Sequence, residues 1–333
     1  MARERPAVRD LAALPKAHLH LHLEAGQRPA MLRELTERYG LPAPEPLDGT
    51  FDTFLRSAKV VFTALHQPEE YARLLREMAE DAVAEGVVWI EAAIWLTQGQ
   101  ADRLGLPNEE AVLAMLLGAA RAAEDATGIG LGFIMQANRM HPPGEALALA
   151  QLAARYASRG VVGFGLADDE VHGPAEPFAE AFAVARSAAL LAVPHAGEVA
   201  GPASVRAALD ALGAHRIQHG VRSVEDPTLV NRLAEDGICL DVCPTSNLQL
   251  GVISDIQLHP LPALIQAGVP VSLNADDPVI FGCTILDEYE VARRRFGFGD
   301  EVLARIAADS IRASGAPDWI RRRAFAGIDA WLR

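Results

Sequence analysis

Three histidines occupy every second position of an otherwise apolar stretch near the start of the chain. His18, His20 and His22 alternate with leucines between Pro15 and Glu24. Alternate side chains of a β-strand point to the same face, so these imidazoles would project together while the leucines pack on the other side. Because imidazole is a common ligand for zinc and similar ions, the stretch favours a metal-chelating strand over a strand with hydrogen-bonded core histidines.

Four other groups of polar residues end apolar runs farther along the chain. They are Asp168-Asp169-Glu170, His195-Ala196-Gly197-Glu198, His219-Gly220 and Asn274-Ala275-Asp276-Asp277-Pro278. Taken alone, each has a simpler interpretation: a carboxylate that caps a helix or faces solvent in a turn, or a histidine at the end of a core strand. Their occurrence together with the alternating histidines indicates an active site.

These residues suit a site for a single zinc ion. Three neutral nitrogens and one anionic oxygen leave a coordination position for water, and the candidate ligands are His20, His22, His195 and Asp276. A bound metal lowers the pKa of water from ~15.7 towards ~7. A lysine-bridged pair of metals is not favoured, because the only lysines, Lys16 and Lys59, do not end a middle strand. We therefore expect one Zn²⁺ per chain.

Three of the polar side chains are candidates for catalysis. His219 and the second oxygen of Asp276 are candidates to orient or deprotonate the water. Glu198 follows a candidate ligand by three residues and is not needed for coordination, so it is free to carry a proton to the substrate.

Helices and strands alternate along the chain, which predicts a parallel sheet. The expected strands are the histidine stretch, Val87–Trp95, Gly130–Gln136, Val161–Ala167, Ala189–His195, Arg216–His219, Gly237–Val242 and Val269–Asn274. The expected helices are Pro29–Tyr39, Phe54–Leu65, Pro68–Gly86, Glu109–Thr127, Pro143–Ser158, Pro177–Ala188, Pro202–Leu212, Pro227–Asp236 and Pro262–Ala267, with closing helices in Asp287–Arg333. Eight such units predict one (β/α)8 TIM barrel domain over residues 1–333, with a doubly wound open sheet as the alternative. In a barrel the polar groups would gather at the C-terminal ends of the strands, where catalytic residues lie.

The composition limits the classes of partner. A formal net charge of −14 argues against a nucleic-acid or anionic-membrane surface. No apolar run approaches the ~20 residues of a membrane span, and the N-terminus lacks the apolar segment of a secretory signal. The three cysteines, Cys239, Cys243 and Cys283, form neither a disulfide framework nor a thiolate zinc motif. We expect a cytoplasmic enzyme with a small-molecule substrate, and a homo-oligomer is left open.

The motifs resemble those of the adenosine deaminase family of the amidohydrolase superfamily. The resemblance spans roughly residues 14 to 330, and two further matches are Pro15-Lys16 and Cys243-Pro244-Thr245-Ser246-Asn247. It implies a metal-dependent hydrolase barrel that deaminates a 6-aminopurine with zinc. It also implies that Glu198 protonates ring N1, that His219 acts on the water attacking C6, that Asp277 bonds ring N7 and that Glu24 touches the sugar.

Two departures from the family pattern concern the substrate. Glu24 stands where adenosine deaminases have Asp, and Asp168 stands where a glycine amide usually meets ring N3. Both count against unmodified adenosine and fit a relative that acts on a 5′-modified adenine nucleoside, similar to the aminodeoxyfutalosine deaminases. The alternatives are a deaminase of adenine or another aminopurine base, an amidohydrolase acting on a pterin, guanine or amide, and a metal-binding relative without turnover. The helix from Phe51 to Leu65 is expected to roof the pocket.

Overall fold

Nine short parallel strands form the centre of the molecule in the computed structural model, which describes residues 9–333. One sheet has the order β1 (Lys16–His22), β2 (Val87–Ile94), β3 (Gly130–Asn138), β4 (Val161–Ala167) and β5 (Leu191–Ala192). The other has the order β6 (His195–Ala196), β7 (Arg216–His219), β8 (Cys239–Val242) and β9 (Val271–Leu273). Every pair of neighbours is parallel, as the alternation of elements predicts.

Hydrogen bonds close the two sheets into one barrel. The strand expected over Ala189–His195 is observed as β5 and β6, which Val193 and Pro194 separate. The Gln218 amide still donates to the Pro194 carbonyl at 3.0 Å, so the ring continues across this break. On the opposite side, the His22 amide donates to the Asp276 carbonyl at 3.0 Å, and the Asp276 amide donates to the His20 carbonyl at 3.1 Å. The closed ring confirms the barrel and excludes the open sheet.

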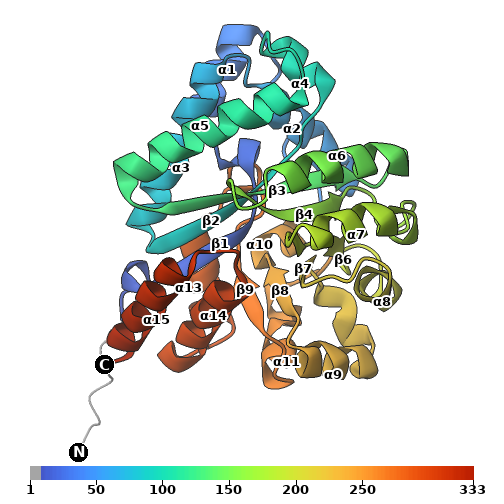
Figure 1. Cartoon of the computed structure of the whole chain (residues 1–333). Coiled ribbons are helices and arrows are strands. Elements are labelled where there is room, and N and C mark those ends of the chain that lie inside the picture. Colours follow the sequence, from blue (N-terminus) through green and yellow to red (C-terminus); the bar gives the residue numbers. More distant parts are fainter. Residues whose placement is uncertain (1–8) are drawn as a thin grey trace, which may run out of the picture.

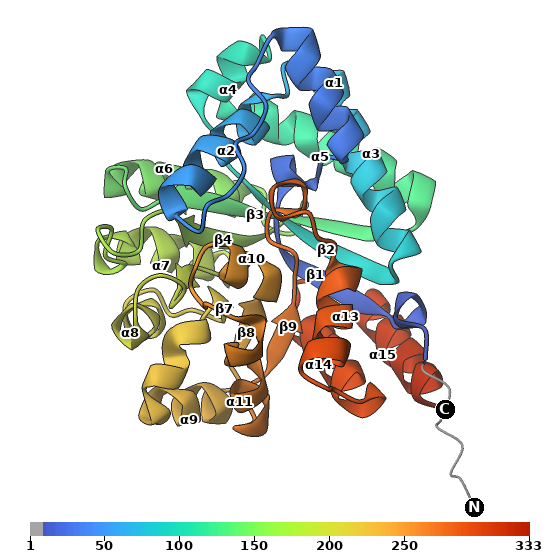
Figure 2. The same cartoon turned by 180° about the vertical axis from the view of Figure 1, so that it is seen from behind.

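Helices cover the outside of this barrel, and a few of them cover its C-terminal end (Figures 1 and 2). They are α1 (Pro29–Tyr39), α2 (Phe51–Thr63), α3 (Pro68–Ala84), α4 (Gln98–Arg103), α5 (Glu109–Thr127), α6 (Pro143–Arg155), α7 (Ala179–Ser187), α8 (Pro202–Asp210), α9 (Pro227–Asp236), α10 (Pro244–Gln249), α11 (Leu261–Gln266), α12 (Pro278–Phe281), α13 (Ile285–Arg295), α14 (Asp300–Ala313) and α15 (Asp318–Leu332). The sequence did not predict α4, α10 and α12, which have six, six and four residues. None of the helices in residues 9–333 combines the length and the apolar character that crossing a membrane requires.

Local signals account for many of the helix boundaries. Five of the outer helices, α1, α3, α6, α8 and α9, begin with a proline, whose fixed φ suits the first turn and whose missing N–H costs nothing there. Helices α1, α5 and α9 end at Gly40, Gly128 and Gly237 in the left-handed conformation. These boundaries fix where each chain segment enters and leaves the barrel.

A buried ionic network lies beneath the histidine cluster inside the barrel. Arg216 donates to Glu91 Oε2 at 2.6 Å and to Asp241 Oδ2 at 2.5 Å, and all three side chains are at most 1% exposed. The Ser272 hydroxyl donates to the other oxygen of Asp241 at 2.6 Å. The backbone carbonyl of Asp241 in turn lies 3.3 Å from Nδ1 of His20. The network therefore connects four strands directly below the candidate metal ligands.

Candidate active site

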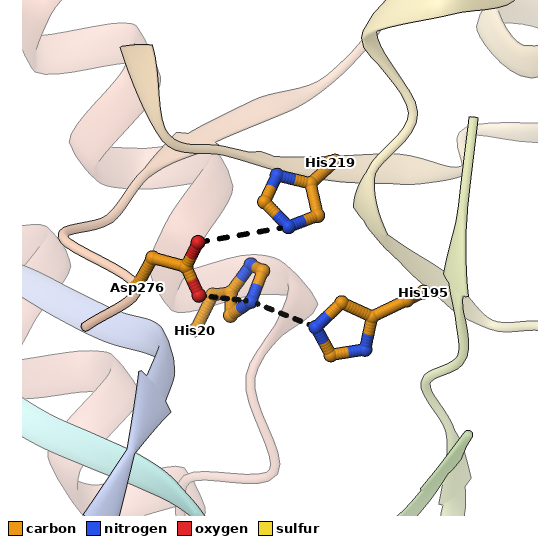
Figure 3. A group of neighbouring side chains, drawn as sticks. All are labelled: His20, His195, His219 and Asp276. Atoms are coloured by element: carbon orange, nitrogen blue, oxygen red, sulfur yellow. Dashed lines mark hydrogen bonds and ion pairs between the residues drawn. The ribbon is translucent and has the colours of Figure 1, made fainter. Parts of the chain in front are cut away.

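The polar groups of the sequence converge at the C-terminal end of the barrel. His20 and His22 come from β1, His195 from β6 and His219 from β7, while Asp276 follows β9. Figure 3 shows His20, His195 and His219 arranged around the Asp276 carboxylate. All five side chains are buried. Strands far apart in the sequence thus deliver the candidate ligands to one point, as the barrel requires.

The arrangement of His20 and His195 fits a bound cation. Nδ1 of His20 faces the Asp241 carbonyl at 3.3 Å, and Nδ1 of His195 faces the Leu166 carbonyl at 3.2 Å. A carbonyl only accepts hydrogen bonds, so both rings carry their proton on Nδ1. Their Nε2 atoms then face each other at 3.2 Å with two lone pairs and no proton between them. Such a contact is repulsive without a positive ion, and neutral imidazoles held in this way are typical zinc ligands.

Asp276 supplies the anionic oxygen of the cluster. Its Oδ1 lies 3.1 Å from Nε2 of His20 and 3.3 Å from Nε2 of His22, and Ser246 donates to its Oδ2 at 2.7 Å. Two overlapping groups of side chains could hold a metal ion, and within each group the donor atoms lie within 4.8 Å of one another. One group is His20, His195, His219 and Asp276, and the other is His22, Asp276 and Asp277. The four predicted ligands are therefore adjacent, and their assignment as the ligand set stays a prediction.

Three non-glycine residues at the mouth of the barrel have positive φ angles. They are Asp168 (87°), His219 (64°) and Asp276 (61°). A side chain in the left-handed region costs free energy and persists where the surroundings impose it, which happens often at active sites. In each case the backbone turns sharply at a strand end, and this turn directs the polar side chain towards the cavity.

Glu198 follows His195 on a loop whose backbone conformation only glycine can adopt at position 197. Gly197 has φ of 70°, and a Cβ atom there would lie 2.4 Å from Cγ2 of Val205, so only glycine fits. Burial, and then the nearby Asp276 carboxylate, raise the pKa of Glu198 well above its ordinary value. A glutamate whose pKa is raised in this way is suited to act as a general acid.

Two residues that the sequence did not single out as catalytic hold this loop. The carboxylate of Glu170 accepts the backbone amides of Gly197, Glu198 and Ala200 at 3.0 to 3.1 Å. Arg139 donates to the His195 carbonyl at 2.6 Å. The sequence signal for Glu170 was its place after β4, which suggested a cap or a turn; the structure shows instead a carboxylate that joins the ends of β4 and β6.

A cavity of about 250 Å³ opens above the cluster. Asp277 and Asp168 both line it, and their role in binding substrate stays a prediction. Asp277 is fully buried, neither of its oxygens has a hydrogen-bond partner within residues 9–333, and burial raises its pKa well above the ordinary value. Asp168 accepts a hydrogen bond from Asn138 at 2.7 Å. The cavity therefore presents both a protonatable acid and a carboxylate to a ligand.

Helix α2 forms the roof of the cavity, as expected. Its residues that line the cavity are Phe51, Phe54, Leu55, Ala58, Lys59 and Phe62. Trp95, which directly follows β2, adds a fourth aromatic side chain, and its indole N–H is buried without a partner in the described chain. The sequence contained no local signal for Trp95, because it ends a run that is apolar except for Glu91.

Glu24 lies away from this cavity. It is 3% exposed and is not among the residues that line the cavity. Its Oε1 is 3.4 Å from the Tyr71 hydroxyl and 3.4 Å from the Gln100 amide nitrogen, and Gln100 donates to Tyr71 at 2.8 Å. Thus the structure brings together every predicted site residue except Glu24, whose contact with a sugar stays a prediction. His18 accepts the Ala275 amide at 3.1 Å and holds the closing loop.

The closed parallel barrel and the buried His/Asp cluster at its C-terminal end, which could hold a metal ion, are the fold and site of the amidohydrolase type. The sequence model of the adenosine deaminase family matches residues 15–331. The chain belongs to this family, whose members are hydrolytic deaminases that act on amidine C–N bonds.

Individual relatives agree with this membership. A Streptomyces virginiae protein provisionally named adenosine/adenine deaminase is 45% identical, over 97% of this chain and 98% of its own. An Agrobacterium fabrum adenine deaminase is 36% identical, over 95% and 98% of the two chains. The crystal structure of adenine deaminase from Arthrobacter aurescens superposes with a TM-score of 0.87 at 30% identity and covers 96% of this chain and 99% of that one. An amidohydrolase from Burkholderia ambifaria with bound Zn gives a TM-score of 0.85 at 27% identity, with 98% and 96% covered.

Proposed function

We propose that this enzyme hydrolyses the 6-amino group of a purine nucleoside, adenosine or a 5′-modified adenosine such as aminodeoxyfutalosine, to give the 6-oxo product and ammonia. The observation that carries the proposal is the cavity, which extends from Glu198 and the histidine cluster to a polar wall and an aromatic roof. One zinc ion held by His20, His22, His195 and Asp276 would supply an activated water for attack at C6.

The chain's own side chains account for the handling of the purine ring. Glu198, whose pKa is raised by burial, protonates ring N1 and makes C6 electrophilic. Asp277 is the hydrogen-bonding partner for ring N7, since its oxygens lack any other partner in the described part of the chain. His219 lies within 3.4 Å of Glu198 and 3.8 Å of Asp276 and acts on the attacking oxygen.

The outer part of the cavity fits a substituent on N9. Asn138 and Asp168 line the cavity with polar atoms suited to a sugar, and the phenylalanines of α2 line it with apolar surface. Lys59 provides the one ammonium group among the described residues that line the cavity, which would suit an anionic group at the 5′ end. This combination supports a nucleoside with an extended 5′ group over an unmodified one.

Free adenine is the second candidate substrate, and the position of Glu24 favours it. Glu24 is enclosed with Tyr71 and Gln100 instead of lining the cavity, which does not favour a contact with a ribose there. Relatives at 35 to 37% identity are named adenine deaminase. For this candidate the outer cavity would hold only water.

A substrate panel tests both candidates. Zinc-loaded protein is assayed spectrophotometrically with adenosine, deoxyadenosine, adenine, methylthioadenosine and aminodeoxyfutalosine, and kcat/KM is compared. We expect a nucleoside to exceed adenine by at least about tenfold, which corresponds to about 1.4 kcal/mol of transition-state binding. The reverse order supports the second candidate, and no turnover of any compound contradicts both.

Two variants extend this test. Glu198→Gln should reduce kcat about 10²- to 10⁴-fold with unchanged zinc content, because an amide cannot deliver the proton. Lys59→Met should reduce kcat/KM for a substrate with an anionic 5′ group and leave that for adenine unchanged. Equal effects of Lys59→Met on both substrates would contradict a contact with the 5′ group.

A further inference from the structure

A chain of three buried hydrogen bonds leads from the backbone to the catalytic histidine. It begins at His259, which precedes α11 and is 3% exposed. The Leu261 amide donates to Nδ1 of His259 at 3.0 Å. A backbone N–H can only donate, so Nδ1 of His259 carries a lone pair. Burial lowers the pKa of His259 to about 3, so the ring is neutral and its single proton is on Nε2.

The second hydrogen bond orients Asn247, which lies in α10 and is fully buried. Nε2 of His259 donates to Oδ1 of Asn247 at 3.2 Å. This contact determines which way the amide points, because the oxygen is the only atom of the amide that accepts from the His259 N–H. The Nδ2 amino group is consequently directed to the opposite side.

The third hydrogen bond reaches His219. Nδ2 of Asn247 lies 3.3 Å from Nδ1 of His219. Because an amide NH₂ group only donates, Nδ1 of His219 accepts and the proton of the neutral ring is on Nε2. This Nε2–H group points into the site, where Glu198 Oε1 is 3.4 Å away and Asp276 Oδ2 is 3.8 Å away. The direction of donation is therefore the same at every step from Leu261 to the active site.

We propose that Asn247 and His259 are positioning residues that fix His219 in its Nε2–H tautomer. Held in this way, His219 has no lone pair towards the cavity. It acts as a hydrogen-bond donor to an oxygen there and not as the resting base that removes a proton from the water. The inference rests on the proposed deamination for its catalytic meaning, but the tautomer itself is a property of the chain that is measured without turnover.

Long-range ¹H–¹⁵N NMR of histidine-labelled, zinc-loaded protein reports the tautomer directly. The His219 signals are identified as those absent from His219→Gln. We expect the proton on Nε2 in the wild-type protein. In Asn247→Asp the side chain has nearly the same shape but both oxygens accept, so Nδ1 of His219 must donate and the proton should move from Nε2 to Nδ1. A wild-type ring protonated on Nδ1, or an unchanged tautomer in Asn247→Asp, overturns the proposal.

Variants of His259 separate positioning from packing. Glutamine places an amide N–H near the position of Nε2, so His259→Gln should preserve the wild-type tautomer, whereas His259→Leu should leave the Asn247 amide free to turn and give a mixture of tautomers. His215→Leu is the matched control, since Nδ1 of His215 also accepts a backbone amide, from Ala192 at 2.9 Å, but far from the cavity. It should leave the His219 signals unchanged. A His219 ring that keeps one tautomer in His259→Leu contradicts the role of His259.

Kinetics with the best substrate of the panel give the functional readout. Asn247→Asp should lower kcat by about 10² or more with a smaller change in KM, because a histidine in the wrong tautomer fails in the transition state and not in ground-state binding. His259→Gln and His215→Leu should stay within about threefold of the wild type. If no compound is turned over while the NMR result holds, the proposed function fails and the positioning stands. If Asn247→Asp changes the His219 tautomer but keeps the wild-type kcat, the proposed catalytic role of the tautomer is contradicted.

Discussion

The Nε2 atoms of His20 and His195 lie 3.2 Å apart, although 175 positions separate the two residues in the sequence. Each ring is held through Nδ1 by a backbone carbonyl, of Asp241 and Leu166 respectively, so both Nε2 atoms present lone pairs to the same point. The fold thus holds two electron-rich atoms together before any ion is bound.

Zinc should stabilise the protein as well as activate it. A cation between the two rings replaces a repulsion by two bonds, and ligand binding to the native state raises stability. We expect chelation to lower the melting temperature, one equivalent of Zn²⁺ to restore it, and His195→Ala to bind zinc at least about tenfold more weakly. Thermal unfolding and metal analysis measure these effects, with the exposed His141→Ala as the control. A melting temperature that does not respond to zinc contradicts the prediction.

Replacing Glu170 by glutamine should loosen the loop that carries Glu198 and leave the zinc content unchanged. The carboxylate accepts three backbone amides of the Gly197–Ala200 loop, whereas a glutamine has only one accepting oxygen. We expect faster hydrogen exchange of these amides and a loss of about 10²-fold in kcat, since small misplacements of a catalytic group have effects of this size. Glu124→Gln, which alters an acceptor for the Leu131 amide at the start of β3, is the control. Unchanged exchange in Glu170→Gln would show that the contacts are incidental.

The ionic network below the site should be essential for stability. Arg216→Met leaves the carboxylates of Glu91 and Asp241 buried without their cation. The loss of one partner from a buried network typically costs about 3–5 kcal/mol, to be measured by urea unfolding. Arg206→Met, which removes a partly exposed ion pair with Asp226, should cost less than about 1 kcal/mol. Equal costs for the two variants would contradict this assignment.

Lys16 should give the stability a characteristic pH dependence. Burial lowers its pKa from 10.5 to about 7 in the folded chain. Between these pH values the unfolded chain binds more protons at this residue than the folded chain does, so its contribution to the free energy of unfolding rises as the pH increases from about 7 to 10.5. Lys16→Met should remove this rise, at most about 1.4 kcal/mol per pH unit. Denaturant unfolding at several pH values tests it, and identical slopes for both proteins would contradict it.

Much of the fold followed from local patterns. Long apolar runs such as Val161–Ala167 were found as strands with the predicted limits, and Pro227–Asp236 was found as the predicted helix. Period and end signals act within a few residues, so the sequence displays them directly. The break at Pro194 was not predicted, because the strand is interrupted into β5 and β6 of two residues each, which are too short to show a two-residue period.

The residue types of the active site were also visible in the sequence. Alternation at His18, His20 and His22 reflects the two-residue period of a strand, and polar residues at strand ends reflect the geometry of a barrel. The residue types and their spacing therefore indicated zinc-ligand chemistry with imidazoles and carboxylates, and a glutamate next to the ligands.

Only the tertiary structure decided how the individual side chains are used. Glu24 is enclosed with Tyr71 and Gln100, Glu170 binds the Glu198 loop, and Asn247 connects His259 to His219. These contacts join residues that are 12 to 76 positions apart in the sequence, and they form only when the barrel closes. Hydrogen-bond partners and tautomers are set by that closure, since a donor or acceptor acquires its role only when another chain segment is packed against it.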